Sequence, residues 1–215
     1  MWGARARGVR GVSTPSRRRV RLASLASLCA LFLSFSLSPE AAGPAEFKGG
    51  LLTPPHAAPD LSLTTQDGNA FRLSAERGKV VALWFGYTFC PDVCPATLAE
   101  LARVHAQLGP RSTRFRIVFV SVDPERDTPA RLRAYVGAFG ARITALTGPP
   151  ERLAEARAAY GVVAEKHAVA GSSAGYLIDH SAFVYVVDPA GQLRLMFPFG
   201  MSSDDMLHDI DQLLD

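Results

Sequence analysis

Residues 80–95 read VVALWFGYTFCPDVCP, a near-continuous apolar run that leads into two cysteines and a proline. A run of this kind is typical of a strand that is buried on both faces, as in parallel sheets. Proline is favoured in the first turn of a helix, so the last residue of the stretch predicts a helix start. The stretch therefore predicts a buried strand over 80–85, a loop that carries Cys90 and Cys94, and a helix over 95–108.

Strands and helices continue to alternate after this stretch. Residues 115–122 form a second apolar run, and residues 128–139 and 150–160 show apolar side chains at helical spacing. Strands that alternate with helices in this way indicate a parallel α/β sheet. The predicted closing elements are a strand over 180–187, a Pro-Ala-Gly-Gln turn, a strand over 193–197 and a helix over 203–214.

A hairpin precedes this alternating region. Residues 61–64 and 70–73 alternate apolar and polar side chains around an Asp-Gly pair, which tolerates the positive φ of a tight turn. A βαβ half joined to a ββα half is the element order of a thioredoxin-like fold. The sequence therefore predicts an α/β domain over residues 60–215, with a thioredoxin-like central sheet flanked by helices and an added N-terminal β-hairpin.

The first 37 residues predict an export signal or a membrane anchor. Seven arginines and no acid occupy residues 1–21, and an uncharged stretch of apolar and small residues follows over 22–37. A helix of that length spans roughly 24 Å, less than the ~30 Å hydrocarbon core, which favours a signal over a full span. The residues that follow form a mediocre cleavage site, so both alternatives stay open. Arginines on the N-terminal side alone predict a domain on the outer, periplasmic side of the cytoplasmic membrane.

Charge and composition exclude nucleic acid as a partner and predict a linker. The net charge of +3 comes from the arginine-rich start, because residues 22–215 carry 16 Lys and Arg against 20 Asp and Glu. No basic stripe is left that could follow a phosphate backbone. Residues 38–59 are rich in Pro, Gly and Ala without periodicity, which predicts a flexible tether between the export segment and the domain.

Two of the three cysteines lie in the loop before the predicted helix. Cys29 lies inside the export segment, where it is interpreted as a small apolar filler. Cys90 and Cys94 lie at a helix N-terminus with Cys94 as the capping residue, so the helix dipole is expected to lower the pKa of both thiols. A structural disulfide is the alternative, but a bridge that closes so short a loop stabilises weakly.

The cysteine spacing and a distant histidine favour a metal site over a redox motif. Thioredoxin-type motifs are C-x-x-C, whereas three residues separate Cys90 from Cys94. In thioredoxin-like oxidoreductases a cis-proline faces the dithiol at the start of the penultimate buried strand. Here His180 holds that position, and no proline occurs between residues 151 and 188. We therefore expect His180 to face the thiols as a ligand, with Asp179 as a partner for its second ring nitrogen.

Three blocks of sequence stand in a distinctive order along the chain. They are FGYTFCPDVCP at 85–95, SVDPERDTP at 121–129 and DHS at 179–181. Together they resemble the signatures of the Sco/SenC family of copper chaperones, which serve assembly of the binuclear copper site of cytochrome c oxidase. The similarity covers residues 60–215. It implies a thioredoxin-like fold, an exported and commonly membrane-tethered protein, and copper ligands at Cys90, Cys94 and His180.

The resemblance implies a copper-binding chaperone that delivers Cu(I) or Cu(II) to the copper-site subunit of cytochrome c oxidase, or helps that site mature. Members of the family are also described as thiol reductants for the cysteines of the oxidase. A thiol-disulfide reductase that uses Cys90 and Cys94 as a redox-active dithiol is therefore the enzymatic alternative. Other copper carriers and thiol reductases are further candidate partners. A peroxiredoxin-like peroxidase is a third interpretation, which would leave His180 unexplained.

The chemistry of the three side chains fits copper independently of the family. Two thiolates and one imidazole form a soft, low-coordinate set that suits Cu(I), and water or Asp92 could complete it for Cu(II). Structural zinc prefers four protein ligands, and only three are predicted here. His105 lies on a leucine-bearing helix face and is expected at the edge of the core. His167 is the one substitute ligand, because the Gly- and Ser-rich stretch after it would let it approach.

Asp123 follows the predicted strand over 115–122, at the sheet edge where α/β folds build their sites. It is a candidate contact to a ligand side chain or to a partner protein. The alternative is that Asp123 and Asp127 shape the loop and cap the helix that begins at Thr128.

Overall fold

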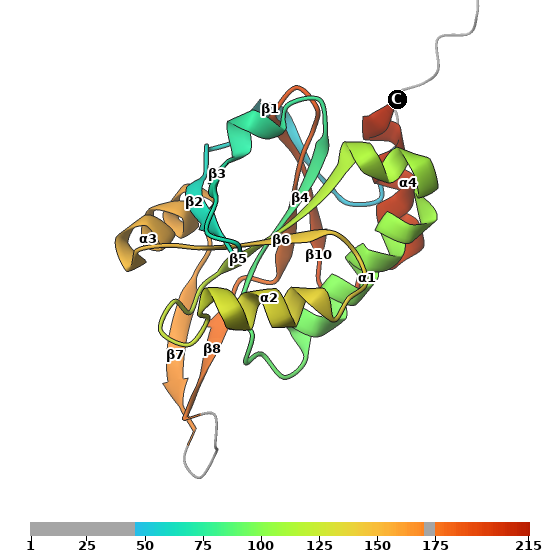
Figure 1. The fold of residues 1–215 in the computed structure, drawn as a ribbon. Helices are drawn as coiled ribbons and strands as arrows, with labels where there is room; N and C mark the ends of the chain where they lie inside the picture. The colour runs from blue at the N-terminus through green and yellow to red at the C-terminus, as the bar shows by residue number, and fades with distance from the viewer. Residues whose placement is uncertain (1–45, 170–174) are drawn as a thin grey trace, which may run out of the picture. The chain divides into compact units, whose positions relative to one another are not determined.

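A mixed sheet of eight strands, in the order β1-β10-β9-β4-β5-β6-β2-β3, organises the fold (Figure 1). The computed structural model describes residues 46–169 and 175–215. The strands are β1 (Gly50–Ala57), β2 (Ser62–Thr65), β3 (Ala70–Arg72), β4 (Val80–Gly86), β5 (Phe115–Ser121), β6 (Ile143–Thr147), β7 (Ala164–Ala168), β8 (Tyr176–His180), β9 (Phe183–Val187) and β10 (Gln192–Pro198). The helices are α1 (Val93–Gln107), α2 (Pro129–Gly137), α3 (Pro150–Ala159) and α4 (Ser203–Leu214), with short 3-10 turns at Leu73–Glu76 and Gly109–Arg114.

The centre of the sheet is built from the longest apolar runs of the domain. β4 pairs in parallel with β5, and β5 pairs in parallel with β6. Every residue of β4 is buried, as expected of a strand that is covered on both faces. The strands predicted over 80–85 and 115–122 are confirmed, and with the flanking helices they form the predicted thioredoxin-like α/β core.

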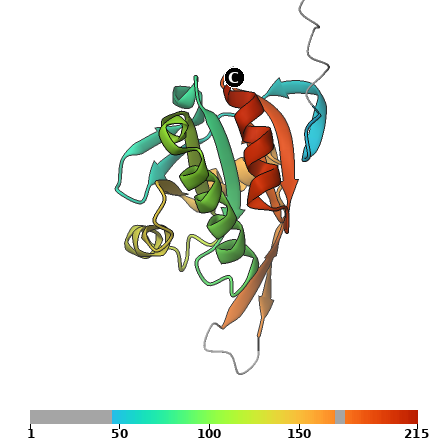
Figure 2. The same cartoon turned by 90° about the vertical axis from the view of Figure 1, so that its right-hand side faces the viewer.

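Helices cover both faces of the sheet. The crossovers through α1 and α2 run in the same direction across the sheet, so right-handed connections put these helices on the same face. α4 packs beside α1 on that face, and Figure 2 shows the two helices side by side. α3 packs on the opposite face, where the ring of Tyr160 lies 5.5 Å from the rings of Phe85 and Tyr185.

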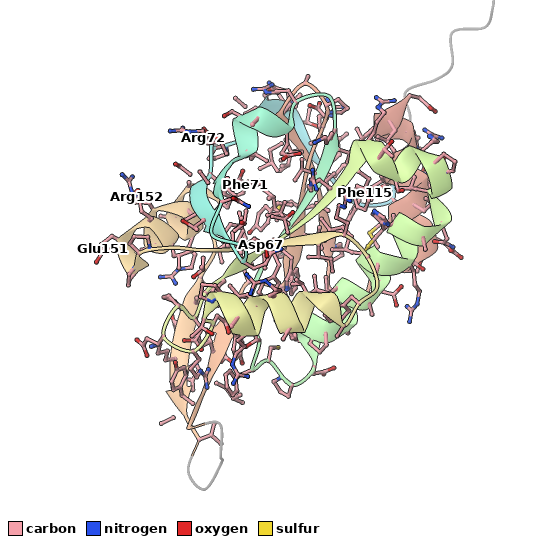
Figure 3. All side chains as sticks on the ribbon, viewed as in Figure 1. Asp67, Phe71, Arg72, Phe115, Glu151 and Arg152 are labelled. Atoms are coloured by element: carbon pink, nitrogen blue, oxygen red, sulfur yellow. The ribbon has the colours of Figure 1, made fainter. Side chains whose placement is uncertain are left out.

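The predicted N-terminal hairpin is present. β2 pairs with β3 and with the edge of β6, which extends the sheet. Phe71 is buried and Arg72, the next residue, is exposed, as the alternation of a strand requires (Figure 3). At the turn, Asp67 accepts a hydrogen bond from Arg133 of α2 at 2.8 Å. This contact ties the hairpin to the helical layer.

The segment predicted as a tether is ordered over part of its length. Residues 50–57 form β1, which pairs antiparallel with β10 at the edge of the sheet. The backbone N–H groups of Lys48 and Gly49 donate to the carboxylate of Asp209 in α4 at 2.8 to 3.1 Å. Prolines are tolerated in an edge strand, because one side of it needs no ladder partner. The tether prediction over 38–59 is therefore wrong for residues 50–57, and the folded domain begins before residue 60.

Asp209 holds this N-terminal attachment, so Asp209→Asn is expected to destabilise the domain. The side chain is fully buried and also pairs with His208. An amide keeps one acceptor oxygen but loses the charge, and a loss of about 1–3 kcal/mol in the free energy of unfolding is expected from urea titration. The control is Asp211→Asn, which removes an ion pair with Arg111 at the surface and should cost less than about 1 kcal/mol. Equal losses of unfolding free energy in both variants would contradict the role of Asp209 in this attachment.

The strand predicted over 180–187 is divided in two. β8 ends at His180, and it pairs with β7 in a separate two-stranded ribbon that projects beyond the main sheet (Figure 1). The Ser181 N–H donates to the Val163 carbonyl and the Val163 N–H donates to Ser181 Oγ, each at 3.0 Å. These bonds turn the chain before β9 begins. His180 therefore lies at the end of the ribbon rather than in a strand of the main sheet.

The predicted export segment lies in residues 1–45, outside the described part of the chain, as do residues 170–174. Among the residues that the structure describes, no helix combines the length and the apolar character needed to cross a membrane.

Candidate metal centre

Two cysteines and one histidine meet beyond the carboxyl end of β4. Cys90 lies in the loop between β4 and α1, Cys94 lies in the first turn of α1, and His180 ends β8. Their ligand atoms all lie within 4.8 Å of one another, and Cys94 Sγ is 3.3 Å from His180 Nε2. Within residues 46–169 and 175–215, this is the one group of three His, Cys, Asp or Glu side chains that is placed to hold a metal ion. The structure thus brings together the three residues that the sequence singles out.

One side of the group is open to solvent. Cys94 is fully buried, whereas Cys90 and His180 are half-buried. A cavity of about 350 Å³ lies in front of Cys90 and His180, and the exposed residues Pro91 and Asp92 belong to its lining. A metal ion or a side chain of another protein therefore reaches Cys90 and His180 before it reaches Cys94.

The helix that carries Cys94 begins earlier than predicted. α1 starts at Val93 with Asp92 as its N-cap residue, so Cys94 lies inside the first turn and not at the cap. The Cys94 backbone N–H donates a hydrogen bond to Cys90 Sγ at 3.4 Å. The positive end of the helix dipole therefore acts on Cys90, and it stabilises a thiolate there.

The two thiols have opposite pKa shifts. A hydrogen bond from the Cys94 thiol, supported by His180 and by backbone N–H groups, outweighs burial and lowers the pKa of Cys90 to about 4. Burial raises the pKa of Cys94, and the negative charge of Cys90 raises it further. The prediction of a lowered pKa for both thiols is therefore wrong for Cys94. The pair shares one proton, which stays on the buried sulfur.

A glycine and an aromatic side chain shape the surroundings of the buried sulfur. A Cβ atom at Gly86 would lie 2.7 Å from Cys94 Sγ and 2.7 Å from Trp84 Nε1, closer than real Cβ contacts. Only glycine therefore lets β4 pass this close to the sulfur. Trp84 packs edge-on against His180, with 5.6 Å between ring centroids. Sequence reasoning missed Trp84 and Gly86, because an apolar strand pattern does not indicate which side chains face the loop beyond it.

A backbone carbonyl, and not Asp179, orients the ring of His180. Nδ1 of His180 lies 3.1 Å from the Ser181 carbonyl oxygen, within hydrogen-bond distance, and Nε2 of the same ring points towards Cys94 Sγ at 3.3 Å. Asp179 precedes His180 in β8 and so points to the other side of the ribbon, where it pairs with His167 at 2.9 Å. The prediction for Asp179 is therefore wrong. His167 contacts Asp179 and does not belong to the Cys90, Cys94 and His180 group.

His105 lies in the second half of α1 and faces β5. Its ring is 6.4 Å from the ring of Phe115, and burial lowers its pKa. The predicted position at the edge of the core is confirmed.

The loop after β5 supports the loop that carries Cys90. Asp127 is buried, and it accepts hydrogen bonds from the Thr88 N–H at 3.1 Å and from the hydroxyl groups of Thr88 and Ser121 at 2.6 and 2.7 Å. Burial raises the pKa of Asp127. The bonds to Thr88 fix the backbone two residues before Cys90.

The two aspartates of this loop do not cap α2. Thr128 is the N-cap residue, and its hydroxyl accepts a hydrogen bond from the Arg131 N–H. Asp123 is fully buried, where it pairs with Arg126 and accepts a hydrogen bond from the Tyr176 hydroxyl. The expectation that Asp123 and Asp127 cap the helix is therefore wrong, and both shape the loop instead.

The unequal pKa values predict that Cys90 alone reacts with an alkylating agent at mildly acidic pH. In a Cys29→Ser background at about pH 6, iodoacetamide is expected to modify Cys90 at least about tenfold faster than Cys94, because Cys90 is a half-exposed thiolate and Cys94 a buried thiol. The Cys90 rate should fall only as the pH drops through about 4, where its sulfur takes up a proton. Mass spectrometry of the digested protein measures both rates, and equal rates would refute the assignment.

The donor set of the group is soft. Two sulfur atoms and one imidazole nitrogen fit copper binding, and the open side leaves room for exchange with another molecule. A metal ion needs both sulfurs as thiolates, so binding would displace the proton that Cys94 keeps in the free protein.

Comparison with known proteins agrees with this geometry. The sequence model of the SCO1/SenC family matches residues 51–215. A SCO2-like protein of Rickettsia prowazekii is 30% identical over 67% of this chain and 71% of its own length. The solution structure of apo Sco1 from Thermus thermophilus is 38% identical, with a TM-score of 0.70, and the match covers 80% of this chain and 99% of that one. ScoI of Bradyrhizobium japonicum, solved with copper bound, is 33% identical with a TM-score of 0.67, and the match covers 74% of this chain and 99% of that one. The family match extends over most of the chain and these relatives share its fold, so the chain belongs to the SCO1/SenC family.

Proposed function

We propose that this protein is a copper-binding chaperone that delivers copper to the binuclear copper site of cytochrome c oxidase, or helps that site mature. The observation that carries the proposal is the meeting of Cys90, Cys94 and His180 within 4.8 Å at a partly open face. Membership of the SCO1/SenC family supports it, as does the copper-bound state in which ScoI of Bradyrhizobium japonicum was solved.

Copper is the cargo in this proposal, and three side chains hold it. Cys90 supplies a thiolate in the free protein, Cys94 becomes a thiolate as it gives up its proton, and His180 supplies Nε2. Two sulfurs suffice for Cu(I), whereas Cu(II) also draws on the imidazole nitrogen and on water or Asp92 at the open side. Because binding releases a proton, the affinity for copper falls as the pH falls.

A thiol-disulfide reductase acting on the cysteines of the oxidase copper site is the second candidate. The observation that favours it is the division of roles between the thiols. Cys90 is a half-exposed thiolate able to attack a disulfide, and Cys94 is a buried thiol beside it able to resolve the mixed disulfide. The reaction would oxidise Cys90 and Cys94 to a disulfide and leave the two cysteines of the partner reduced.

Under both candidate functions, we expect the domain to lie outside the cytoplasm. The arginine-rich start and the apolar stretch over 22–37 support export to the periplasmic side, with a membrane tether where the segment is retained. The copper-site subunit of the oxidase is the expected partner there. An export-dependent reporter fused after Asp215 should be active, and an inactive reporter would refute this location.

A transfer assay with separate copper and thiol readouts decides between the candidates. The full chain is loaded with one equivalent of copper and mixed with the soluble, metal-free copper domain of an oxidase subunit, whose cysteines are either reduced or joined as a disulfide. A chaperone moves copper to the reduced acceptor. A reductase instead reduces the acceptor disulfide even when the full chain carries no copper. A protein that binds no copper and reduces no disulfide would refute both.

A further inference from the structure

One arginine lies between the two chain segments that carry the candidate ligands. The guanidinium carbon of Arg126 is 3.5 Å from the ring centroid of Tyr176, 4.5 Å from that of Phe89 and 5.7 Å from that of Tyr87. Phe89 directly precedes Cys90 in the β4–α1 loop. Tyr176 is the first residue of β8, the strand that ends at His180, so a single side chain contacts both segments.

Buried charge and hydrogen bonds fix this arginine in place. Nε of Arg126 pairs with the fully buried Asp123 at 2.5 Å, and Nη1 donates to the Tyr176 carbonyl oxygen at 2.9 Å. The Tyr176 hydroxyl donates to the other oxygen of Asp123 at 2.7 Å. Arg126, Asp123 and Tyr176 thus form a closed triangle of contacts, which we call the clamp.

The ribbon needs such a contact because it lies outside the main sheet. β7 and β8 pair only with each other, so no sheet ladder holds β8 against the domain. In the middle of β8, the Ile178 N–H donates to the Tyr87 hydroxyl at 3.1 Å. The clamp holds the beginning of the strand, and His180 lies at its far end.

We propose that Arg126 is a positioning residue that docks β8 against the cysteine loop and thereby sets how often His180 is in reach of Cys94. The proposal rests on the function proposed above and adds to it the device that makes the third ligand available. Arg126 acts through Tyr176 and Phe89, which belong to the ligand-bearing segments.

The clamp has different consequences for the two copper oxidation states. Cu(I) is held by two thiolates, and both of these belong to one short loop and helix turn that Asp127 supports separately. Cu(II) draws on the imidazole, which only a docked β8 supplies. Loss of the clamp should therefore weaken Cu(II) binding much more than Cu(I) binding.

The test compares Arg126→Gln with Arg131→Gln in the full chain. Arg131, from α2, also lies 4.5 Å from the Phe89 ring, which makes it the matched control. Hydrogen exchange of the copper-free protein is measured first, and residues 176–180 should exchange roughly tenfold faster or more in Arg126→Gln, because they lose the contacts that hold them. The Arg131→Gln exchange should stay native.

Copper binding is measured next on the same variants. In Arg126→Gln, the affinity for Cu(II) should fall roughly tenfold or more, the usual range for loss of a residue that orients a ligand, and nitrogen coupling in the electron paramagnetic resonance spectrum should weaken. One Cu(I) should still bind. Tyr176→Leu removes the stacked ring but keeps the Arg126–Asp123 pair, so it should reproduce both effects if Arg126→Gln fails to fold.

Native exchange over 176–180 and native Cu(II) binding in both clamp variants would overturn the proposal. Equal losses of Cu(I) and Cu(II) would also overturn it, since they would mean that the cysteine loop itself had been disturbed. If the wild-type protein bound no copper, the proposed function would fail, and the exchange measurement would still decide whether Arg126 docks the strand.

Discussion

Replacement of Cys90 or of Cys94 by serine is expected to abolish copper binding by the full chain. Either change leaves one thiolate and one imidazole, a set that is neither soft nor charged enough to hold copper against competing thiols. The affinity should fall by more than the roughly 10- to 100-fold that loss of an outer partner of a ligand costs. Sulfur-to-copper charge-transfer absorption of the Cu(II) form should vanish in both variants, as optical titration and metal analysis would record.

Cys29→Ser is the matched control for this prediction. It removes a cysteine from the predicted export segment and leaves the group of Cys90, Cys94 and His180 untouched. Copper stoichiometry and the absorption band should remain native. A Cys90→Ser or Cys94→Ser protein that kept one copper with the native spectrum would show that the ligands have been misassigned.

The centre of the fold and the residues of the candidate site could be predicted because local pattern and chain order determine them. An apolar run that is buried on both faces predicts β4, and the cysteines that follow it must lie at the carboxyl edge of the sheet. His180 could be placed opposite them because the element order is that of a thioredoxin-like fold. These inferences need no knowledge of side-chain contacts.

The elements that pattern missed have weak apolar periodicity. β1 is almost entirely exposed and contains two prolines, so its composition is that of a linker although it pairs with β10. β7 and β8 are short and mostly exposed or half-buried, because a ribbon outside the main sheet buries little. The predicted strand over 180–187 is therefore wrong at its start, since the apolar run of β9 gives no sign that β8 ends at His180.

The sequence pattern also cannot predict the electrostatics of the site. The dipole argument treats both sulfurs alike, but a sulfur that is fully buried beside a thiolate keeps its proton. Which sulfur is buried depends on Gly86, whose missing Cβ makes room for Cys94. The partner of His180 depends on strand alternation in β8, which turns Asp179 to the other side of the ribbon.

His180→Ala is expected to separate the two copper oxidation states and the two proposed functions. The variant keeps Cys90 and Cys94 in place, since Asp127 and the first turn of α1 hold the backbone around them. It should bind one Cu(I) with reduced affinity. Its affinity for Cu(II) should fall by more than roughly 100-fold, because the remaining two sulfurs do not meet the coordination that Cu(II) prefers. Competition titrations with a chelator of each ion measure the two affinities.

His167→Ala and His105→Ala are the controls, because His167 pairs with Asp179 and His105 packs against Phe115. Both should bind copper as the native protein does, and a damaging His167→Ala change would refute the assignment of His180.

The reduction potential of the Cys90–Cys94 pair distinguishes the copper chaperone from the thiol-disulfide reductase. If the protein is a chaperone, His180→Ala should change copper retention far more than it changes this potential. The native protein should also reduce insulin slowly. Brisk insulin reduction that His180→Ala leaves unchanged would favour the reductase, since such activity would need the dithiol alone.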